Sequence, residues 1–200
     1  MSELNFTAGT SARVIVGVSG ASGAIYGWRL LEKLRELPHV ETHLILTRSG
    51  ERTAFLELGK RSADFKRLAH HTYPMEDIGS RLASGSYLTQ GMVIAPCSVN
   101  SMSAIATGNT NNLLTRSADV MLKERRKLIL MVREMPFHLG HLRTMTALAE
   151  MGAIIAPPVP GFYHHPQPVL DLVDHCVDRV LDLLGLPVPD AKRWDPQKQA

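Results

Sequence analysis

The sequence predicts an α/β protein: a single Rossmann-like (flavodoxin-like) domain of three layers, with a parallel sheet between helices. Short runs rich in β-branched residues alternate with longer segments whose apolar residues recur at helical spacing. Each short run is almost continuously apolar, which is typical of parallel strands covered on both faces. The 200 residues suffice for one domain with a sizeable core, and neither an internal repeat nor a linker divides them.

Five runs are expected to form the strands. The first, RVIVGVS, leads into a glycine-rich turn, and the second, ETHLILT, ends in a hydroxyl residue. The others are GMVIAP, KLILMV and GAIIAP. In residue numbers, the five strands are expected at 13–19, 41–47, 91–96, 127–132 and 152–157.

Helices are expected between these strands. The first begins at Ala24, has one apolar face and is stopped by Pro38, and the next extends to about Leu58. Two more flank the fourth strand, and a final amphipathic helix ends at Gly185. Residues 59–90 give no clear element, because they are mixed, polar and rich in turn signals.

Composition is that of a globular protein, with 44% apolar and 20% charged residues. We expect a disordered extension at 1–12, the domain at 13–185 and an irregular tail at 186–200. The net charge of +3 is small and the basic residues are spread out, so no nucleic-acid-binding stripe is expected. The densest basic run, 123–127, lies where a helix should end, which favours a solvated helix end over a basic patch.

Cysteine usage and hydropathy indicate the compartment. Cys97 and Cys176 are the only cysteines and lie far apart, which suits a reducing cytoplasm rather than a disulfide framework. The first residues lack the pattern of a signal peptide, and no apolar run approaches the ~20 residues that span a bilayer. We therefore expect a soluble cytoplasmic protein without membrane contact.

The turn after the first strand, SGASGAIYG, has the small residues and free N–H groups of an anion site. It is not a dinucleotide fingerprint, because Val18 stands where the first glycine of the motif belongs. The second strand also ends in Thr47 rather than in an acid that would bind ribose hydroxyls. A monophosphate such as that of FMN therefore fits better than a pyrophosphate. A purely structural turn with Ser22 as the helix cap explains this stretch equally well.

A second polar cluster, PCSVNSMSAIATGNTNN, follows the third strand. Its residues Ser98, Asn100 and Ser101 offer hydroxyl and amide groups to a flavin or its ribityl chain. A plain helix cap would explain Ser98 but not the whole set.

Charged residues suggest a second anion site. Arg133 and Glu134 end the fourth strand, where they form either a structural ion pair or part of a site. A further cationic and phenolic set consists of Arg116, Lys123, Tyr163 and Arg179. Because converging cations are costly unless they bind an anion, we expect one anion site for a cofactor and one for a substrate.

Metal and thiol chemistry are not expected. His138, His141, His164 and His165 lack the spacing of a metal motif. Cys97 has no evident base beside it, so a buried thiol is the expected role.

In combination, five motifs resemble those of the UbiX/Pad1 flavin prenyltransferases, a family within the group of flavin-containing cysteine-decarboxylase folds. These motifs are GASGAIYG, GMVIAPCS, RSADVMLKERRKLIL, VREMPFHLGHL and PPVPGFYHHPQ, and the resemblance covers residues 13–194. It implies metal-independent transfer of a dimethylallyl group from dimethylallyl monophosphate to N5 and C6 of reduced FMN. The product would serve a UbiD-type decarboxylase, as in ubiquinone synthesis. The resemblance also implies a homo-oligomer, a dodecamer, with the pocket at subunit contacts.

The resemblance assigns residues by position. It implies proton-transfer or other catalytic roles for Glu134, Ser22, Glu57 and Lys123. The residues implied to contact FMN are Gly20, Ala21, Ser22, Thr47, Ser98, Val99, Asn100, Ser101 and Arg133. Those implied to contact the dimethylallyl phosphate are Arg116, Lys123, Tyr163 and Arg179, with Trp194 of the tail packing over the pocket. Thr47 stands where many relatives have Ser, and Ser117 replaces the usual Ala beside Arg116.

Two alternative functions would also use the first anion site to bind FMN. One is an FMN-dependent oxidative decarboxylase of cysteine-ended peptides, and the other is a non-catalytic FMN carrier. Neither requires the second cationic set, so that set favours prenyl transfer.

Overall fold

The computed structural model describes residues 11–163, 165–189 and 191–194. Six parallel strands form one sheet in the order β3-β2-β1-β4-β5-β6, which confirms the predicted α/β fold. The strands are β1 (Ala12–Val18), β2 (Val40–Leu46), β3 (His71–Tyr73), β4 (Gly91–Cys97), β5 (Lys127–Val132) and β6 (Ile154–Ile155).

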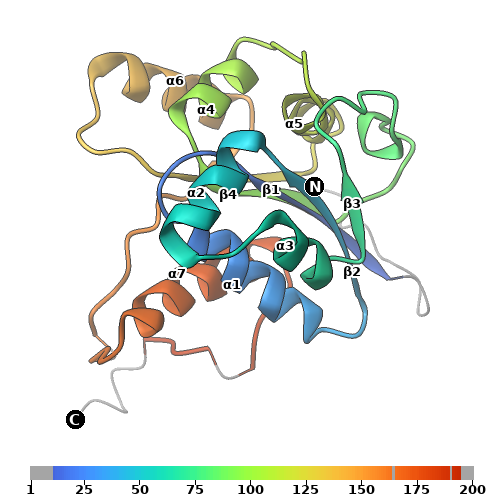
Figure 1. Ribbon diagram of the computed structural model, residues 1–200. Helices are drawn as coiled ribbons and strands as arrows, with labels where there is room; N and C mark the ends of the chain where they lie inside the picture. Colours follow the sequence, from blue (N-terminus) through green and yellow to red (C-terminus); the bar gives the residue numbers. More distant parts are fainter. Residues whose placement is uncertain (1–10, 164, 190, 195–200) are drawn as a thin grey trace.

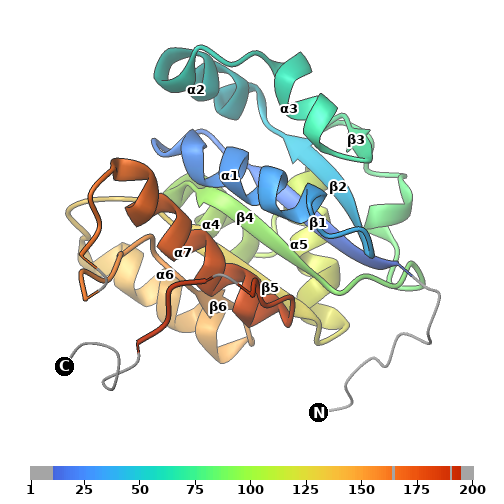
Figure 2. The ribbon, with the colours of Figure 1, turned by 90° about the horizontal axis from the view of Figure 1, so that it is seen from below.

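Helices cover both faces of the sheet (Figure 1). The helices are α1 (Ala24–Arg35), α2 (Arg48–Leu58), α3 (Ser62–Leu68), the 3-10 helix η1 (Arg81–Ala83), α4 (Val99–Ala106), α5 (Leu113–Lys123), α6 (Leu139–Glu150) and α7 (Val169–Leu184). One core joins the sheet to α1, α2, α3 and α7, and the other joins it to α4, α5, α6 and η1. Figure 2 shows α7 beside α1, with α4, α5 and α6 behind the sheet. The sheet therefore separates α5 from α7.

The central strands form where the sequence is most continuously apolar. Every residue of β4 is buried, and β1 and β2 each have six buried residues of seven. Burial on both faces leaves only the ends of such strands free to carry polar groups. The candidate site is therefore confined to the loops at the strand ends.

The structure differs from the sequence-based elements in two places. Residues 59–90, without a clear prediction, contain α3, the edge strand β3 and η1. The fifth expected strand, 152–157, is reduced to the two residues of β6 at the other edge. The two short strands, β3 and β6, are the edge strands of the sheet, and a strand that pairs on one side only can be short.

The predicted boundaries of the N-terminal extension and the tail stay predictions. Residues 1–10 and 195–200 lie outside the described residues, as do positions 164 and 190. Leu186 is buried against the core that contains α7, so the chain stays packed on the domain just beyond Gly185. No helix in the described part of the chain is long and apolar enough to cross a membrane.

Candidate functional site

A cavity of about 800 Å³ lies at the carboxyl ends of β1, β2 and β4, where ligands of open α/β sheets bind. Five residues expected to contact FMN line it: Gly20, Thr47, Ser98, Asn100 and Ser101. The cavity is also lined by residues for which the sequence predicted no individual role, namely Arg48, Ser49, Met75, Glu76, Asn109, Asn111, Asn112, Leu114 and Thr115. The three asparagines belong to the polar cluster that was considered as a whole.

Ser19 holds two walls of this cavity together. Its buried hydroxyl donates to the Pro96 carbonyl oxygen at 2.7 Å and accepts from the Ser98 backbone N–H at 2.8 Å. The bonds join the end of β1 to the end of β4. Gly20 follows directly, and a Cβ atom there would lie 2.3 Å from the Cβ atom of Ser49. The close approach of α2 to the first turn therefore requires glycine at position 20.

Two helices begin at the cavity. Thr47 caps α2, since its hydroxyl oxygen accepts from the Gly50 N–H at 2.9 Å. Ser98 caps α4 in the same way through the Ser101 N–H, and its hydroxyl also donates to the Ser101 hydroxyl oxygen at 3.1 Å. First-turn N–H groups carry partial positive charge and lack helical partners. The N-cap residues of α2 and α4, Thr47 and Ser98, both line the cavity. The part of the cavity beside them is therefore suited to an anion.

The N-terminus of α1, in contrast, is occupied by the protein's own carboxylate. Glu57 accepts from the backbone N–H groups of Gly23 and Ala24, each at 2.9 Å, and the Ser22 hydroxyl also bonds to it. Gly23 is the N-cap residue and adopts a φ of 99°, in the left-handed region. The alternative in which Ser22 caps α1 is therefore wrong. Glu57 lies 34 residues further along the chain than Gly23, so local sequence could not reveal this contact.

The groups around Glu57 stabilise its ionised carboxylate. Partial burial raises the pKa of Glu57, but this is outweighed by hydrogen bonds from Ser22 and two backbone N–H groups and by the charge of Arg133. The net result is a pKa below the ordinary value of 4.5. Arg133 itself donates from Nε to the Ser22 carbonyl oxygen at 3.1 Å. Ser22, Glu57 and Arg133 therefore form one connected group beside the first turn.

Glu134 lies just beyond β5. Its Oε1 accepts from the Met135 N–H at 3.0 Å, and no ion pair among the described residues joins it to Arg133. The structural ion pair considered from sequence is not formed. Among the described residues, no cation forms an ion pair with the Glu134 carboxylate.

The second cationic set is divided between the two faces of the sheet. Arg116 pairs with Asp119 at 2.6 Å on α5, and Lys123, at the end of that helix, pairs with Glu124. Arg179 lies on α7, across the sheet (Figures 1 and 2). One chain therefore does not bring Lys123 and Arg179 to a common anion.

Tyr163 and Trp194 lie on the α7 side with Arg179. The Tyr163 and Trp194 rings meet edge to face, with centroids 5.4 Å apart, and the Tyr163 ring also meets His175 of α7. Arg179 and Arg193 share the carboxylate of Asp182. Three of the residues implied to contact the prenyl donor thus belong to one region. Asp182 and Arg193 were not predicted, and neither carries a motif signal.

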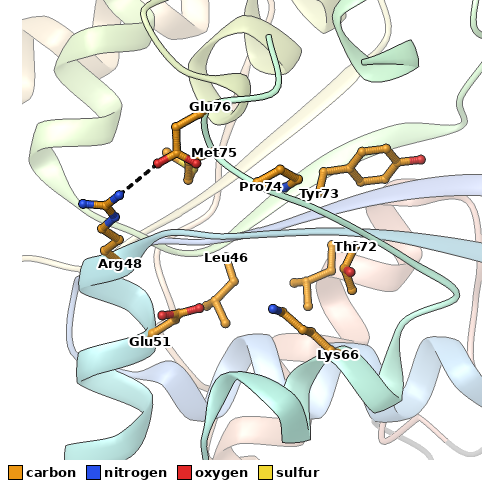
Figure 3. Close-up of a pocket in the computed structure, with 10 residues that line it drawn as sticks. Leu46, Arg48, Glu51, Lys66, Thr72, Tyr73, Pro74, Met75 and Glu76 are labelled. Atoms are coloured by element: carbon orange, nitrogen blue, oxygen red, sulfur yellow. Dashed lines mark hydrogen bonds and ion pairs between the residues drawn. The ribbon is translucent and has the colours of Figure 1, made fainter. Parts of the chain in front are cut away.

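A smaller cavity of about 280 Å³ lies between β2, β3 and the helices α2 and α3 (Figure 3). It shares Arg48, Met75 and Glu76 with the larger cavity, and the exposed ion pair Arg48–Glu76, at 3.3 Å, lies between the two. None of the residues predicted for the site lines it.

The remaining candidate thiol and histidine groups are placed as follows. Cys97 is fully buried, and burial raises the pKa of its thiol to about 12. Within the described ranges, no three His, Cys, Asp or Glu side chains are grouped to hold a metal ion. His164 lies outside those ranges.

Comparison with known proteins agrees with this architecture. A family model described as Flavoprotein matches residues 5–181. The flavin prenyltransferase UbiX of Salmonella typhimurium is 52% identical over 177 residues, which are 88% of this chain and 94% of that protein. A solved structure described as a dodecameric FMN-dependent UbiX-like decarboxylase from Escherichia coli O157:H7 has a TM-score of 0.89 and 45% identity, covering 92% of this chain and 99% of its own.

A second solved structure, AnUbiX (PadA1) in complex with FMN and dimethylallyl pyrophosphate, has a TM-score of 0.90 and 40% identity. The match covers 92% of this chain and 98% of the other. The similarities extend over nearly the whole domain rather than over the phosphate turn alone. The chain therefore belongs to the flavoprotein family and, within it, to the UbiX-type flavin prenyltransferases.

Proposed function

We propose that this protein transfers a dimethylallyl group from dimethylallyl monophosphate to reduced FMN. The allylic C–O bond breaks and phosphate leaves with its electron pair, while new bonds form to N5 and C6 of the flavin. The flavin loses one proton at each position, the alkene carbon takes up one proton and the phosphate takes up the other. No oxidant or reductant is consumed. The observation that carries this proposal is a second set of cationic side chains outside the anion cavity.

FMN would occupy the 800 Å³ cavity with its phosphate against the first turns of α2 and α4. Thr47 and Ser101 supply hydroxyl groups there, and Val99 and Asn100 supply backbone N–H groups of the first turn of α4. Gly20 and Ala21 would lie along the flavin, and Arg133 would meet it from the end of β5. Glu57 already occupies the N-terminus of α1. A single phosphate is therefore enough for the other two helix N-termini, those of α2 and α4.

Proton transfer falls to the carboxylates near the turn. The ionised Glu57 carboxylate accepts a hydrogen bond from the Ser22 hydroxyl, so the pair can act as the accepting end of a proton relay beside the flavin. Glu134 has no ion-pair partner among the described residues and is free to exchange a proton with the leaving phosphate or with C6. Fixed cations would stabilise the phosphate as its charge develops.

The donor site requires two copies of the chain. Tyr163, Arg179 and Trp194 would contact the donor from one subunit, and Arg116 and Lys123 would come from another, because the sheet separates them within a chain. The exposed apolar side chains beside Glu134, Met135 (87% exposed) and Leu139 (59%), provide surface for that contact. The dodecameric state of the E. coli structure supports a homo-oligomer, and we propose a dodecamer here.

The product would be passed to a UbiD-type decarboxylase, as in ubiquinone synthesis, and we place the reaction in the cytoplasm. Two free cysteines, both buried, are consistent with a reducing compartment. We also propose that the monophosphate is the donor, which parallel assays with dimethylallyl monophosphate and dimethylallyl pyrophosphate would test.

The decisive experiment incubates the protein anaerobically with reduced FMN and dimethylallyl monophosphate. Mass spectrometry of the extracted flavin should show a gain of one dimethylallyl unit. An oxidative decarboxylase would instead release carbon dioxide from cysteine-ended peptides with oxidised FMN, and a carrier would return FMN unchanged. Unmodified flavin at saturating donor would reject prenyl transfer.

A further inference from the structure

Asp182 of α7 binds two arginines at once. Arg193 donates to it in bidentate fashion, with Nη1 2.6 Å from Oδ2 and Nη2 2.7 Å from Oδ1. Arg179, one helical turn before Asp182, donates from Nη1 to Oδ2 at 2.9 Å. The Asp182 side chain is only 14% exposed, whereas the two arginines are 60% and 48% exposed. A nearly buried carboxylate is therefore the common anchor of two solvent-facing cations.

The two arginines belong to different parts of the proposed donor site. Arg179 is a proposed ligand of the donor phosphate. Arg193 immediately precedes Trp194, whose ring packs edge to face on Tyr163 at 5.4 Å between centroids. The Tyr163 ring packs in turn on His175 of α7, at 5.5 Å. Asp182 thus connects the orientation of a phosphate-binding cation to the position of the segment 191–194.

Helix α7 is itself fixed to the helix that follows the first turn. Arg29 of α1 bonds to both carboxylate oxygens of Asp174, each at 2.8 Å, and Lys33 bonds to Asp178 at 2.5 Å. Half-buried, hydrogen-bonded ion pairs of this kind restrict relative movement of the two helices. Asp182 is therefore held in a constant place relative to α1.

The charge of Asp182 is secured by the same contacts. The hydrogen bonds from Arg193 are the largest cause of the lowered pKa of Asp182, partial burial opposes them, and the charges of Arg193 and Arg179 add to the lowering. A guanidinium has five N–H donors in a planar fork, and Arg179 uses one N–H direction on Asp182. Its other donors make no hydrogen bond to the described residues, and with the side chain 60% exposed they are available to a phosphate.

We propose that Asp182 is a positioning residue that holds Arg179 toward the donor phosphate and, through Arg193, holds Trp194 against Tyr163. The donor phosphate would then bind an Arg179 that is already oriented, beside Trp194 and Tyr163 rings that are already in contact. The inference rests on the proposed function for its kinetic consequence, whereas the contact of Trp194 with Tyr163 is a feature of the fold itself. The two parts can be tested separately.

The first test needs no prenyl donor. In a W28F background, Trp194 is the only tryptophan, so acrylamide quenching of its fluorescence reports its accessibility. D182N should increase the quenching constant about twofold, because loss of the charge weakens the bidentate contact with Arg193. K192A is the matched control: it removes the neighbouring tail ion pair Lys192–Asp171, at 3.3 Å, and should leave quenching nearly unchanged. Equal quenching of D182N and its parent would overturn the proposed docking.

The second test measures donor kinetics at saturating reduced FMN. D182N should raise the KM for dimethylallyl monophosphate about tenfold, with kcat and FMN affinity near the parent values. R193A should move Trp194 as D182N does but raise KM less, because Arg179 keeps its carboxylate. A general structural role would instead lower FMN affinity, kcat and the melting temperature together, and that pattern would reject a positioning role. If the parent protein transfers no prenyl group, the proposed function fails, while the quenching test still decides whether Asp182 docks the tail.

Discussion

At the scale of single residues, Glu57 shows how one side chain can decide what a turn binds. Its carboxylate takes the N–H groups of Gly23 and Ala24 that the sequence offered to a phosphate. The first turns of α2 and α4, which we propose as the phosphate site, are not occupied in this way. Glycine content suggested an anion site in this region but did not indicate which helix N-terminus a carboxylate of the protein itself would occupy.

Glu57→Gln should lower the free energy of unfolding by about 1 kcal/mol at pH 7, because the amide has one acceptor oxygen instead of two for the α1 N-terminus. The pKa of Glu57 is lowered in the folded protein, so its stabilising effect is present above the unfolded value of about 4.5 and is lost as pH falls through the lower folded value. The difference between wild type and variant should therefore shrink between pH 5 and pH 3. Urea unfolding across this range measures it, and a constant difference would contradict the assignment.

Ser117, beside Arg116 on α5, gives a second test. Its side chain is fully buried in α5, and its hydroxyl oxygen has no hydrogen-bond partner in the described part of the chain. Ser117→Ala should therefore raise the free energy of unfolding by about 1 kcal/mol, since it removes an unsatisfied buried polar group. Thermal and urea unfolding measure this gain. The KM for the donor should not change, and a large rise would place the hydroxyl in the donor site instead.

At the scale of elements, strand ends were the most informative part of the sequence. Ser98 was predicted as a ligand contact from the polar cluster after the third strand, and Thr47 from the family resemblance. Both follow a long apolar run and line the cavity. Strand β3 was missed because its three residues are exposed or half-buried and carry no apolar pattern. The contact of Glu57 with α1 was missed because it depends on how α2 packs, which no local pattern records.

The caps of α2 and α4 are expected to serve both folding and FMN binding. Ser98→Ala should cost about 1 kcal/mol of stability. It should also weaken FMN binding about tenfold, because the cap oxygen orients the first turn of α4 toward the phosphate. His138→Ala is the control, since His138 caps α6 through the Gly140 and His141 N–H groups and does not line the cavity. Isothermal titration with FMN should distinguish the two variants, and equal FMN affinities would remove Ser98 from the phosphate site.

At the scale of the whole molecule, the arrangement of the two helical layers predicts complementation between defective subunits. Lys123→Ala should impair donor binding, and Glu134→Gln should lose a proton-transfer group, with a loss in rate of about 10²–10⁴. If one subunit supplies Lys123 and another Glu134, oligomers that mix the two variants contain some sites with both native residues. Co-expressed, differently tagged chains should therefore regain activity, whereas each variant alone should not. No recovery in the mixed oligomers would place both residues in one subunit.

The sheet that separates α5 from α7 has a consequence for kinetics. If neither face carries a complete donor site, a dissociated chain binds FMN but has no turnover, however well it is folded. Specific activity should then depend on enzyme concentration, falling on dilution below the dissociation constant of the assembly, while FMN affinity per chain changes much less. Sedimentation and rate measurements on the same dilution series test this. The equilibrium between single chains and the oligomer is therefore a point at which product formation can be regulated. Such regulation would change no residue that contacts the flavin.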